Sequence, residues 1–413
     1  MSIFRSVFYF AFFALMLTTA CILHAQNFDL KYELEDILRV DGKREASDFN
    51  EWTEKARPRI LKAMDTLYGP EPDSRNFKIT HLILERSDSA LNGLAKRVQL
   101  RIKIEADGAE KSLDLLIYIP RLAALPAPVF LAISGSENFR VADDFSILAS
   151  STNIPASAIS KGRGADSAMW CVESILKRGY AFAVFDATSL FADSKSGAKN
   201  SIYKISKNQS DDENCGAISA WAWGAKIAFE ALKNISDADS SRVALLGHSR
   251  FAKAALVASA RYPLFKLTIL NNSGCMGAAL SRRAQGETIA SITKNFPYWF
   301  SENLKNYASK EFNLPLEQSE IIALIAPRYV YVASASEDSW ADPEGEFMSL
   351  VEAGKVYALK GKFKFPTRTD FKVGNSFFGD CAWHLRKGPH GLTLEDWVNF
   401  IDFADECMFA PDF

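Results

Sequence analysis

The sequence predicts an α/β fold in which helices cover both faces of a mostly parallel sheet, giving a three-layer sandwich. Short, nearly continuous apolar runs are typical of strands buried on both faces, and they occupy 128–134, 180–186, 243–247, 267–270 and 329–333. Helical patterns alternate with or follow the later runs, at 217–232, 252–260, 345–352 and 395–407. Because strands that alternate with helices pair in parallel, this order indicates a covered parallel sheet.

The sheet is expected to open with antiparallel strands. Three β-rich runs at 77–84, 98–105 and 113–120 are separated by polar or glycine-containing turns. Such short connections join neighbouring antiparallel strands. These runs therefore extend the parallel sheet at one edge.

Residues 1–25 have the pattern of a secretory signal. Arg5 precedes an uncharged apolar run at 7–17, and small residues follow it. Cleavage after Ala25 gives a soluble exported protein, periplasmic or secreted, which we favour over a lipoprotein anchored through Cys21, because Thr18 stands where lipoprotein signals usually carry Leu. No later segment has the roughly 20 uninterrupted apolar residues of a membrane span.

We divide the remaining chain into an N-terminal helical extension, 26–75, and a catalytic domain, 76–413. A helical pattern from 28 to about 72 carries apolar residues at three- and four-residue intervals, and Pro58 is expected to interrupt or restart that helix. Within the catalytic domain, an insertion at 136–170 is rich in Ser, Ala and Gly. We interpret it as a long surface loop.

The charge balance and the cysteines of the sequence exclude some classes of function. The formal net charge is −2, from 48 basic and 50 acidic residues, which argues against a nucleic-acid partner. Six cysteines have no CxxC spacing, so zinc is not suggested. Loss of Cys21 with the signal leaves five, so at least one thiol is unpaired, and we interpret the cysteines as small buried side chains. We expect a monomer.

The most informative stretch is Gly247-His248-Ser249-Arg250, which follows an apolar strand and precedes a helix. A serine in this strand-turn-helix context sits on a tight turn with its hydroxyl exposed above the sheet, and the next amide faces the developing oxyanion. The common motif ends in Gly, where this chain has Phe251. The motif alone therefore fits a nucleophile and a helix-capping serine equally well.

Asp338 and His390 favour the nucleophile. An α/β-hydrolase triad runs Ser, acid, His along the chain, and both residues follow Ser249 in that order, each after an expected strand position. His384 is the main competitor for the base, and its alternative interpretation is a packing or supporting residue. The sequence therefore predicts an α/β-hydrolase fold with a serine nucleophile.

Several further motifs resemble one family. They are Gly247-His-Ser-Arg-Phe-Ala-Lys253, Asn271-Asn-Ser-Gly-Cys-Met-Gly-Ala-Ala-Leu-Ser-Arg-Arg283, Gly286-Glu-Thr288, Phe296-Pro-Tyr-Trp-Phe300, Glu337-Asp-Ser-Trp-Ala-Asp342 and Gly388-Pro-His390. This set, spread over about 217–403, resembles the bacterial branch of the glucuronoyl esterases, carbohydrate esterase family 15. The resemblance implies an α/β-hydrolase fold that needs no metal, and we expect no cofactor. It also implies cleavage of esters between the carboxyl of (4-O-methyl-)glucuronate on xylan and an alcohol such as a lignin hydroxyl.

The resemblance implies roles for individual residues. Ser249 is the nucleophile, His390 is the base, and Arg250 faces the oxyanion with its amide and guanidinium. Lys253 and Glu287 correspond to contacts with sugar hydroxyls. Trp340 corresponds to a platform beside the sugar ring.

Two positions depart from the family pattern. Ala252 stands where the family usually has Gly, and Asn272 stands where some members carry a Glu acid. An amide cannot supply the carboxylate of a triad, so we assign that role to Asp338. Asp342, next to Pro343, is expected to cap the following helix.

Other interpretations stay open. An acetyl (xylan) esterase or a peptidase can use the same fold, and an exported carbohydrate-binding protein could retain an inactive one. Among the supporting residues, Lys253 could be solvated and Arg250 could be a structural ion-pair partner. Glu287 could belong to a surface network, and Trp340 could be core.

Overall fold

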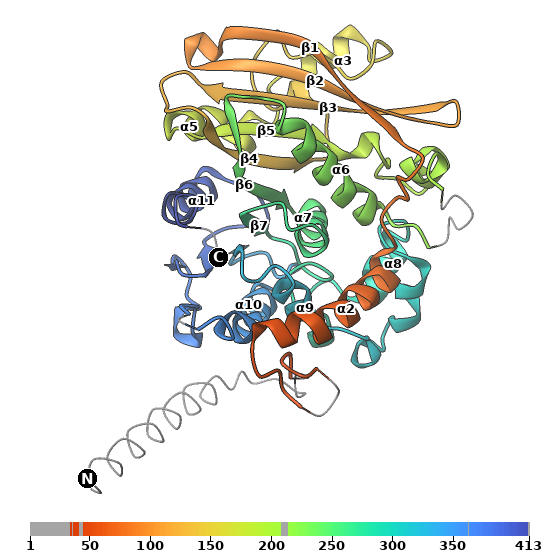
Figure 1. Ribbon diagram of the computed structural model, residues 1–413, viewed down its shortest axis with the longest axis vertical. Helices are drawn as coiled ribbons and strands as arrows, with labels where there is room; N and C mark the ends of the chain where they lie inside the picture. Colours follow the sequence, from red (N-terminus) through yellow and green to blue (C-terminus); the bar gives the residue numbers. More distant parts are fainter. Residues whose placement is uncertain (1–33, 35, 41–43, 208–213, 362, 412–413) are drawn as a thin grey trace, which may run out of the picture.

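One ten-stranded sheet organises the molecule, a computed structural model that describes residues 34, 36–40, 44–207, 214–361 and 363–411 (Figure 1). The strand order is β1-β2-β3-β5-β4-β6-β7-β8-β10-β9. Strands β5, β4, β6, β7, β8 and β10 pair in parallel, while β1, β2, β3 and β9 pair antiparallel with their neighbours. The bounds are β1 (Lys78–Ala90), β2 (Ala95–Ala106), β3 (Ala109–Pro120), β4 (Ala127–Ser134), β5 (Ala181–Asp186), β6 (Ala238–His248), β7 (Leu267–Asn271), β8 (Tyr329–Ala335), β9 (Ser376–Phe377) and β10 (Cys381–Arg386).

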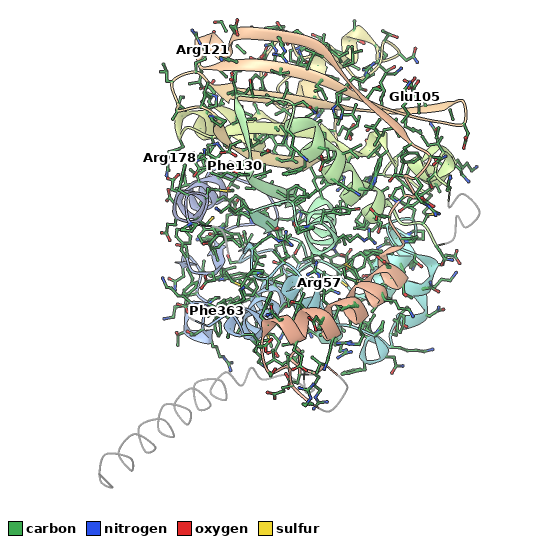
Figure 2. All side chains as sticks on the ribbon, viewed as in Figure 1. Arg57, Glu105, Arg121, Phe130, Arg178 and Phe363 are labelled. Carbon is green, nitrogen blue, oxygen red and sulfur yellow. The ribbon has the colours of Figure 1, made fainter. Side chains whose placement is uncertain are left out.

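Helices cover both faces of this sheet, which confirms the predicted three-layer α/β sandwich. One buried apolar cluster includes side chains of α2, α6, α7, α9 and α10, and a second cluster on the opposite face includes side chains of α5 and α11. Phe130 of β4, labelled in Figure 2, belongs to the second cluster, where its ring lies 5.6 Å from that of Trp397. The helix bounds are α2 (Phe49–Tyr68), α3 (Ala156–Gly162), α4 (Ser167–Trp170), α5 (Val172–Lys177), α6 (Ala217–Leu232), α7 (Arg250–Arg261), α8 (Ile289–Asn295), α9 (Gln318–Ala323), α10 (Pro343–Ala358) and α11 (Leu394–Cys407).

Helix α2 differs from the expectation in two ways. It is shorter than the predicted 28 to about 72, since the described residues before it form turns and an isolated bridge between Arg39 and Glu45, and Pro58 lies inside an unbroken helix. Proline removes one backbone hydrogen bond, here to the carbonyl of Glu54. Both residues are exposed, so water can replace that bond, while Trp52 and Ile60 on the opposite side are completely buried. Packing of the buried face therefore keeps the helix continuous across the proline.

Arg57 joins α2 to the rest of the molecule (Figure 2). Its guanidinium donates hydrogen bonds to the backbone oxygens of Leu324, after α9, and Ala260, in α7. The division into an extension and a catalytic domain remains a prediction, although α2 shares the first apolar cluster with the catalytic helices. The predicted signal, 1–25, lies outside the described residues.

The insertion at 136–170 is more ordered than a simple loop. It contains α3, α4 and a short 3-10 turn, Asn138–Arg140. Arg97 of β2 binds Asp144 at 2.5 Å, and Gln99 donates to the oxygen of Ser146. These contacts fix the insertion against the sheet.

The five cysteines of the described chain are free, and four of them are buried. This confirms the expectation of an unpaired thiol and of small buried side chains. None of the helices in the described part of the chain is long and apolar enough to cross a membrane.

Candidate active site

Ser249 lies at the carboxyl end of β6, on the turn into α7. Its backbone has φ 57° and ψ −129°, which is a strained conformation for a residue other than glycine, and its N–H donates to the oxygen of Asn271 at 2.9 Å. A Cβ at Gly247 would lie 2.1 Å from the oxygen of Phe251, so only glycine fits beneath the turn. This is the local geometry of a nucleophile elbow.

Phe251, the departure from the common motif, fits because of a second glycine. A Cβ at Gly135, just after β4, would lie 2.3 Å from the Phe251 ring. The ring also packs against Trp221 of α6, with centroids 4.9 Å apart. The bulky side chain therefore occupies space left by Gly135 in the neighbouring loop.

Asp338 and His390 meet at the carboxyl ends of two neighbouring strands, β8 and β10. The Nδ1 atom of His390 lies 2.6 Å from Oδ2 of Asp338, which also accepts from Nδ2 of Asn272 at 3.0 Å. Asp338 is 5% exposed, whereas the side chain of His390 is 43% exposed. Because a carboxylate only accepts hydrogen bonds, Nδ1 carries the hydrogen and Nε2 is left as the basic atom.

Burial by itself raises the pKa of Asp338. The hydrogen bond and charge of His390, together with hydrogen bonds from Asn272 and the amide of Ala341, outweigh burial and hold that pKa below its usual range. The carboxylate is therefore ionised at neutral pH and can stabilise a protonated His390.

The ring of His390 packs against that of His248. The two rings are 4.7 Å apart, and His248 directly precedes Ser249. Burial, followed by the charge of His390, lowers the pKa of His248 to about 4. His384 has a different environment, because it is 1% exposed and contacts the Tyr331 hydroxyl and Asp396.

Arg250 points its guanidinium toward Asp193. Nε lies 2.6 Å from Oδ2 of Asp193, but its hydrogen is not aligned with that oxygen, so the contact is an ion pair rather than a hydrogen bond. Asp193 also accepts from the hydroxyl of Tyr298 and from the indole of Trp299. Among the described residues, no group accepts a hydrogen bond from either Nη atom of Arg250, which leaves both available to a ligand.

Lys253 and Glu287 bind each other below the surface. The Lys253 ammonium lies 3.2 Å from Oε2 of Glu287 and also donates to the oxygens of Ser273 and Cys275. Both residues are at most 6% exposed. The structure thus brings the two predicted sugar contacts together, and three acceptors occupy the ammonium.

Trp340 is 52% exposed, as a sugar platform requires. Its backbone oxygen accepts from the N–H of Glu287 at 2.8 Å, so the two segments carrying these residues lie side by side. Asp342 caps α10 through the N–H of Gly345, which confirms that prediction, and it also pairs with Arg283.

Sequence reasoning missed Asp193, Gly135 and the role of Asn272 as a hydrogen-bond donor to Asp338. Asp193 and Gly135 are distant in the sequence from the residues that they contact. The substitution of Phe251 for glycine was the one available signal, since a bulky residue there requires a small neighbour.

Within the described chain, no group of three His, Cys, Asp or Glu side chains is arranged to hold a metal ion.

Comparisons with known proteins agree with this geometry. The family model described as "Glucuronyl esterase, fungi" matches residues 147–361. Carbohydrate esterase MZ0003, from an unknown prokaryotic organism, is 35% identical over 92% of this chain and 90% of its own length. The chain belongs to the glucuronoyl esterases.

Solved structures of this family superpose closely. A glucuronoyl esterase from Solibacter usitatus has a TM-score of 0.84 at 34% identity, covering 92% of this chain and 99% of its own. An esterase of carbohydrate esterase family 15 from a marine bacterial metagenome, described as promiscuous, has a TM-score of 0.82 at 33% identity, with coverages of 92% and 98%. The predicted resemblance and the α/β-hydrolase fold are therefore confirmed, and the chain belongs with carboxylic ester hydrolases.

Proposed function

We propose that this glucuronoyl esterase is an exported serine esterase that hydrolyses the ester between (4-O-methyl-)glucuronic acid on xylan and an alcohol such as a lignin hydroxyl. The observation that carries the proposal is the strained Ser249 turn beside a buried Asp338 carboxylate that holds His390 at 2.6 Å. A serine hydroxyl is a weak nucleophile until such a base removes its proton.

In the proposed reaction, Nε2 of His390 takes the proton from Oγ of Ser249 as Oγ attacks the uronate carbonyl carbon. The carbonyl oxygen becomes negative in the tetrahedral intermediate. His390 then gives its proton to the departing alcohol oxygen, and an acyl-enzyme remains on Ser249. Water then attacks the carbonyl carbon of the acyl-enzyme while His390 takes the water proton. The bond to Oγ of Ser249 breaks, His390 returns the proton to Oγ, and glucuronate is released.

Arg250 is the proposed stabiliser of the negative oxygen. A cation already in place stabilises developing charge more than it stabilises the neutral ester. Its Nε is held by Asp193, and the two Nη atoms are the groups that can face the oxyanion. The ion pair with Asp193 and the oxyanion role are therefore compatible.

Trp340 and Glu287 are the proposed sugar-binding residues, and Lys253 acts through Glu287 because its ammonium already has three acceptors. The exposed indole can stack on the ring C–H groups of glucuronate. Glu287 and Lys253 form the polar side of this site, where the ammonium of Lys253 orients the Glu287 carboxylate that faces sugar hydroxyls. The remaining proposals from the sequence are a monomer, an export signal at 1–25 and no nucleic-acid partner.

Turnover of matched esters tests the proposal. Methyl and benzyl esters of glucuronate should be hydrolysed in preference to an acetyl ester and a peptide amide, and Ser249→Ala should lose activity on all of them. The acetyl ester belongs in the comparison because the marine relative is described as promiscuous. A preference for the acetyl ester would replace the proposed function with an acetyl esterase.

A further inference from the structure

A buried carboxylate behind the proposed triad collects five hydrogen bonds, and the proposed mechanism uses none of its partners. Asp396, in the first turn of α11, is completely buried. Its Oδ2 accepts from Nε of Arg386 at 2.8 Å and from the amide and hydroxyl of Thr393. Its Oδ1 accepts from Nε2 of His384 at 2.8 Å and from Nδ2 of Asn271 at 3.4 Å.

Arg386 extends from this carboxylate to the loop that carries His390. Its Nη2 donates to the oxygens of Pro389, at 2.9 Å, and Gly391, at 2.8 Å, the residues on either side of His390. Its Nη1 donates to the oxygen of Lys387 at 3.3 Å. One guanidinium, 3% exposed, thus fixes the loop backbone on both sides of the proposed base.

The loop is also joined to the segment that carries the acid. The N–H of Ser336 donates to the oxygen of Arg386, and the N–H of Glu337 donates to the oxygen of Gly388, each at 2.9 Å. A shift of the Arg386 backbone therefore changes the alignment of His390 with Asp338.

A second connection runs from Asp396 to the ring of His390. The amide nitrogen of Asn271 faces Asp396, so its oxygen faces Nδ1 of His248, 2.6 Å away, and that Nδ1 carries the hydrogen. The His248 ring packs on His390 at 4.7 Å. Asp396 is thus connected to His390 in two ways. Arg386 links it to the backbone around His390, and Asn271 and His248 link it to the His390 ring.

We infer that Arg386 and Asp396 are positioning residues for His390. The side chain of His390 is 43% exposed and lies in a short loop between Gly388 and Gly391, so its own segment does little to fix it. A general base must stay within a fraction of an ångström of the proton that it takes. The inference rests on the proposed role of His390.

Arg328 provides a matched control. Like Arg386, it donates to three backbone oxygens, those of Ser259, Tyr262 and Phe265. Arg386 is the last residue of β10, whereas Arg328 directly precedes β8, at the opposite end of the parallel strands. Arg386→Lys and Arg328→Lys each remove a guanidinium that binds three backbone oxygens, and Arg386→Lys also alters the contact with Asp396. Only the Arg386 guanidinium lies beside His390.

The experiment measures three quantities in the full chain: the labelling rate of Ser249 by a fluorophosphonate, kcat and KM on benzyl glucuronate, and the low-field proton resonance of His390 Nδ1–H, assigned with His390→Gln. Arg386→Lys should lower the labelling rate and kcat by about 10- to 100-fold, leave KM nearly unchanged and weaken the resonance. Arg328→Lys should change each rate by no more than about 2-fold.

Equal effects of the two lysine variants, or normal kcat and resonance in Arg386→Lys, would overturn the inference. If Arg386→Lys does not fold, Asp396→Asn, which preserves volume and removes the charge, is judged by the same criteria. The wild-type protein separates this inference from the proposed function. Labelling of Ser249 without glucuronate ester turnover would refute only the substrate, whereas absence of labelling would refute the base and the inference with it.

Discussion

Asp338 has His390 and Asn272 on one oxygen and the amide of Ala341 on the other. Asparagine at 338 would either face the Ala341 amide with its own NH₂ or present that NH₂ to His390, and in both cases it loses the charge that stabilises the imidazolium. We expect Asp338→Asn to lower kcat about 10,000-fold with an unchanged circular dichroism spectrum.

The control is Asp342→Asn, which should affect turnover much less, because Asp342 caps α10 and binds Arg283 rather than His390. Adding Asn272→Glu to Asp338→Asn should recover part of the rate, since the Asn272 side chain already contacts the acid at 3.0 Å. Failure of that rescue alone would show only misalignment at 272, but near-normal turnover by Asp338→Asn would refute the assignment of the acid.

Arg250→Ala should lower kcat by roughly 100- to 1000-fold and change KM little, because the ester is neutral and charge appears only in the transition state. Asp193→Asn is the companion variant. It keeps the cation but removes its partner, so we expect a smaller fall in kcat. Steady-state kinetics on benzyl glucuronate measure both, and a raised KM with unchanged kcat in Arg250→Ala would make Arg250 a ground-state contact.

Trp340→Ala should impair hydrolysis of glucuronate esters and leave a small activated ester without a sugar nearly untouched. The indole is 52% exposed, so its removal should also leave the melting temperature almost unchanged. Equal losses on both substrates would show that Trp340 supports the fold rather than the sugar.

Elements were easiest to predict where their own residues carry a clear pattern. The parallel strands β4 to β8 follow from short apolar runs, and helices α6, α7, α10 and α11 follow from helical patterns. Strand β10 was only implied, because His384 and Arg386 interrupt its apolar sequence. These polar residues are buried only because Asp396, from a later helix, binds both, and a local pattern cannot reveal such a partner.

The contact between Gly135 and Phe251 at the elbow also could not be predicted from a local pattern. It gives a prediction for the packing of β4 against α7. Gly135→Ala should destabilise the protein by roughly 1–3 kcal/mol, because its Cβ would lie 2.3 Å from the Phe251 ring. In a Phe251→Ala background the same change should cost little. Urea denaturation of the four proteins in this cycle measures the coupling, and additive effects would contradict the packing account.

At the scale of the whole molecule, the sandwich was predictable because buried strands and amphipathic helices have strong periodic signals, whereas the helix expected from 28 to about 72 is confined to α2 (Phe49–Tyr68). The site was predictable in part, since Ser249, Asp338 and His390 stand in a recognisable order. Contacts between distant loops could not be predicted. No sequence pattern indicates that Arg250 pairs with Asp193 or that Lys253 pairs with Glu287. Those contacts depend on how the carboxyl ends of several strands meet.

Glu346 makes the stability of the whole molecule depend on pH. It is completely buried in α10 and accepts from Ser273, Gly274 and Ser334, and no cation among the described residues pairs with it. Burial, partly offset by these hydrogen bonds, raises its pKa from 4.5 to about 7. A raised folded-state pKa stabilises the fold fully below pH 4.5, and this contribution is lost as pH rises through about 7.

Wild-type stability should therefore fall between about pH 5 and 8 by on the order of 3 kcal/mol relative to Glu346→Gln, which cannot ionise. Urea midpoints measured across that range for both proteins provide the comparison. Parallel pH profiles would mean that Glu346 has the same pKa in the folded and the unfolded protein, which would refute the raised folded-state pKa.

The proposed mechanism requires that glucuronate becomes attached to Ser249 during turnover. The direct measurement mixes the wild-type protein with benzyl glucuronate, quenches it in acid within milliseconds and determines the masses of the proteolytic peptides. We predict a glucuronoyl group on the peptide that contains Ser249 and none in Ser249→Ala, which should also be inactive. A glucuronoyl group on another residue, or undiminished turnover by Ser249→Ala, would contradict the account.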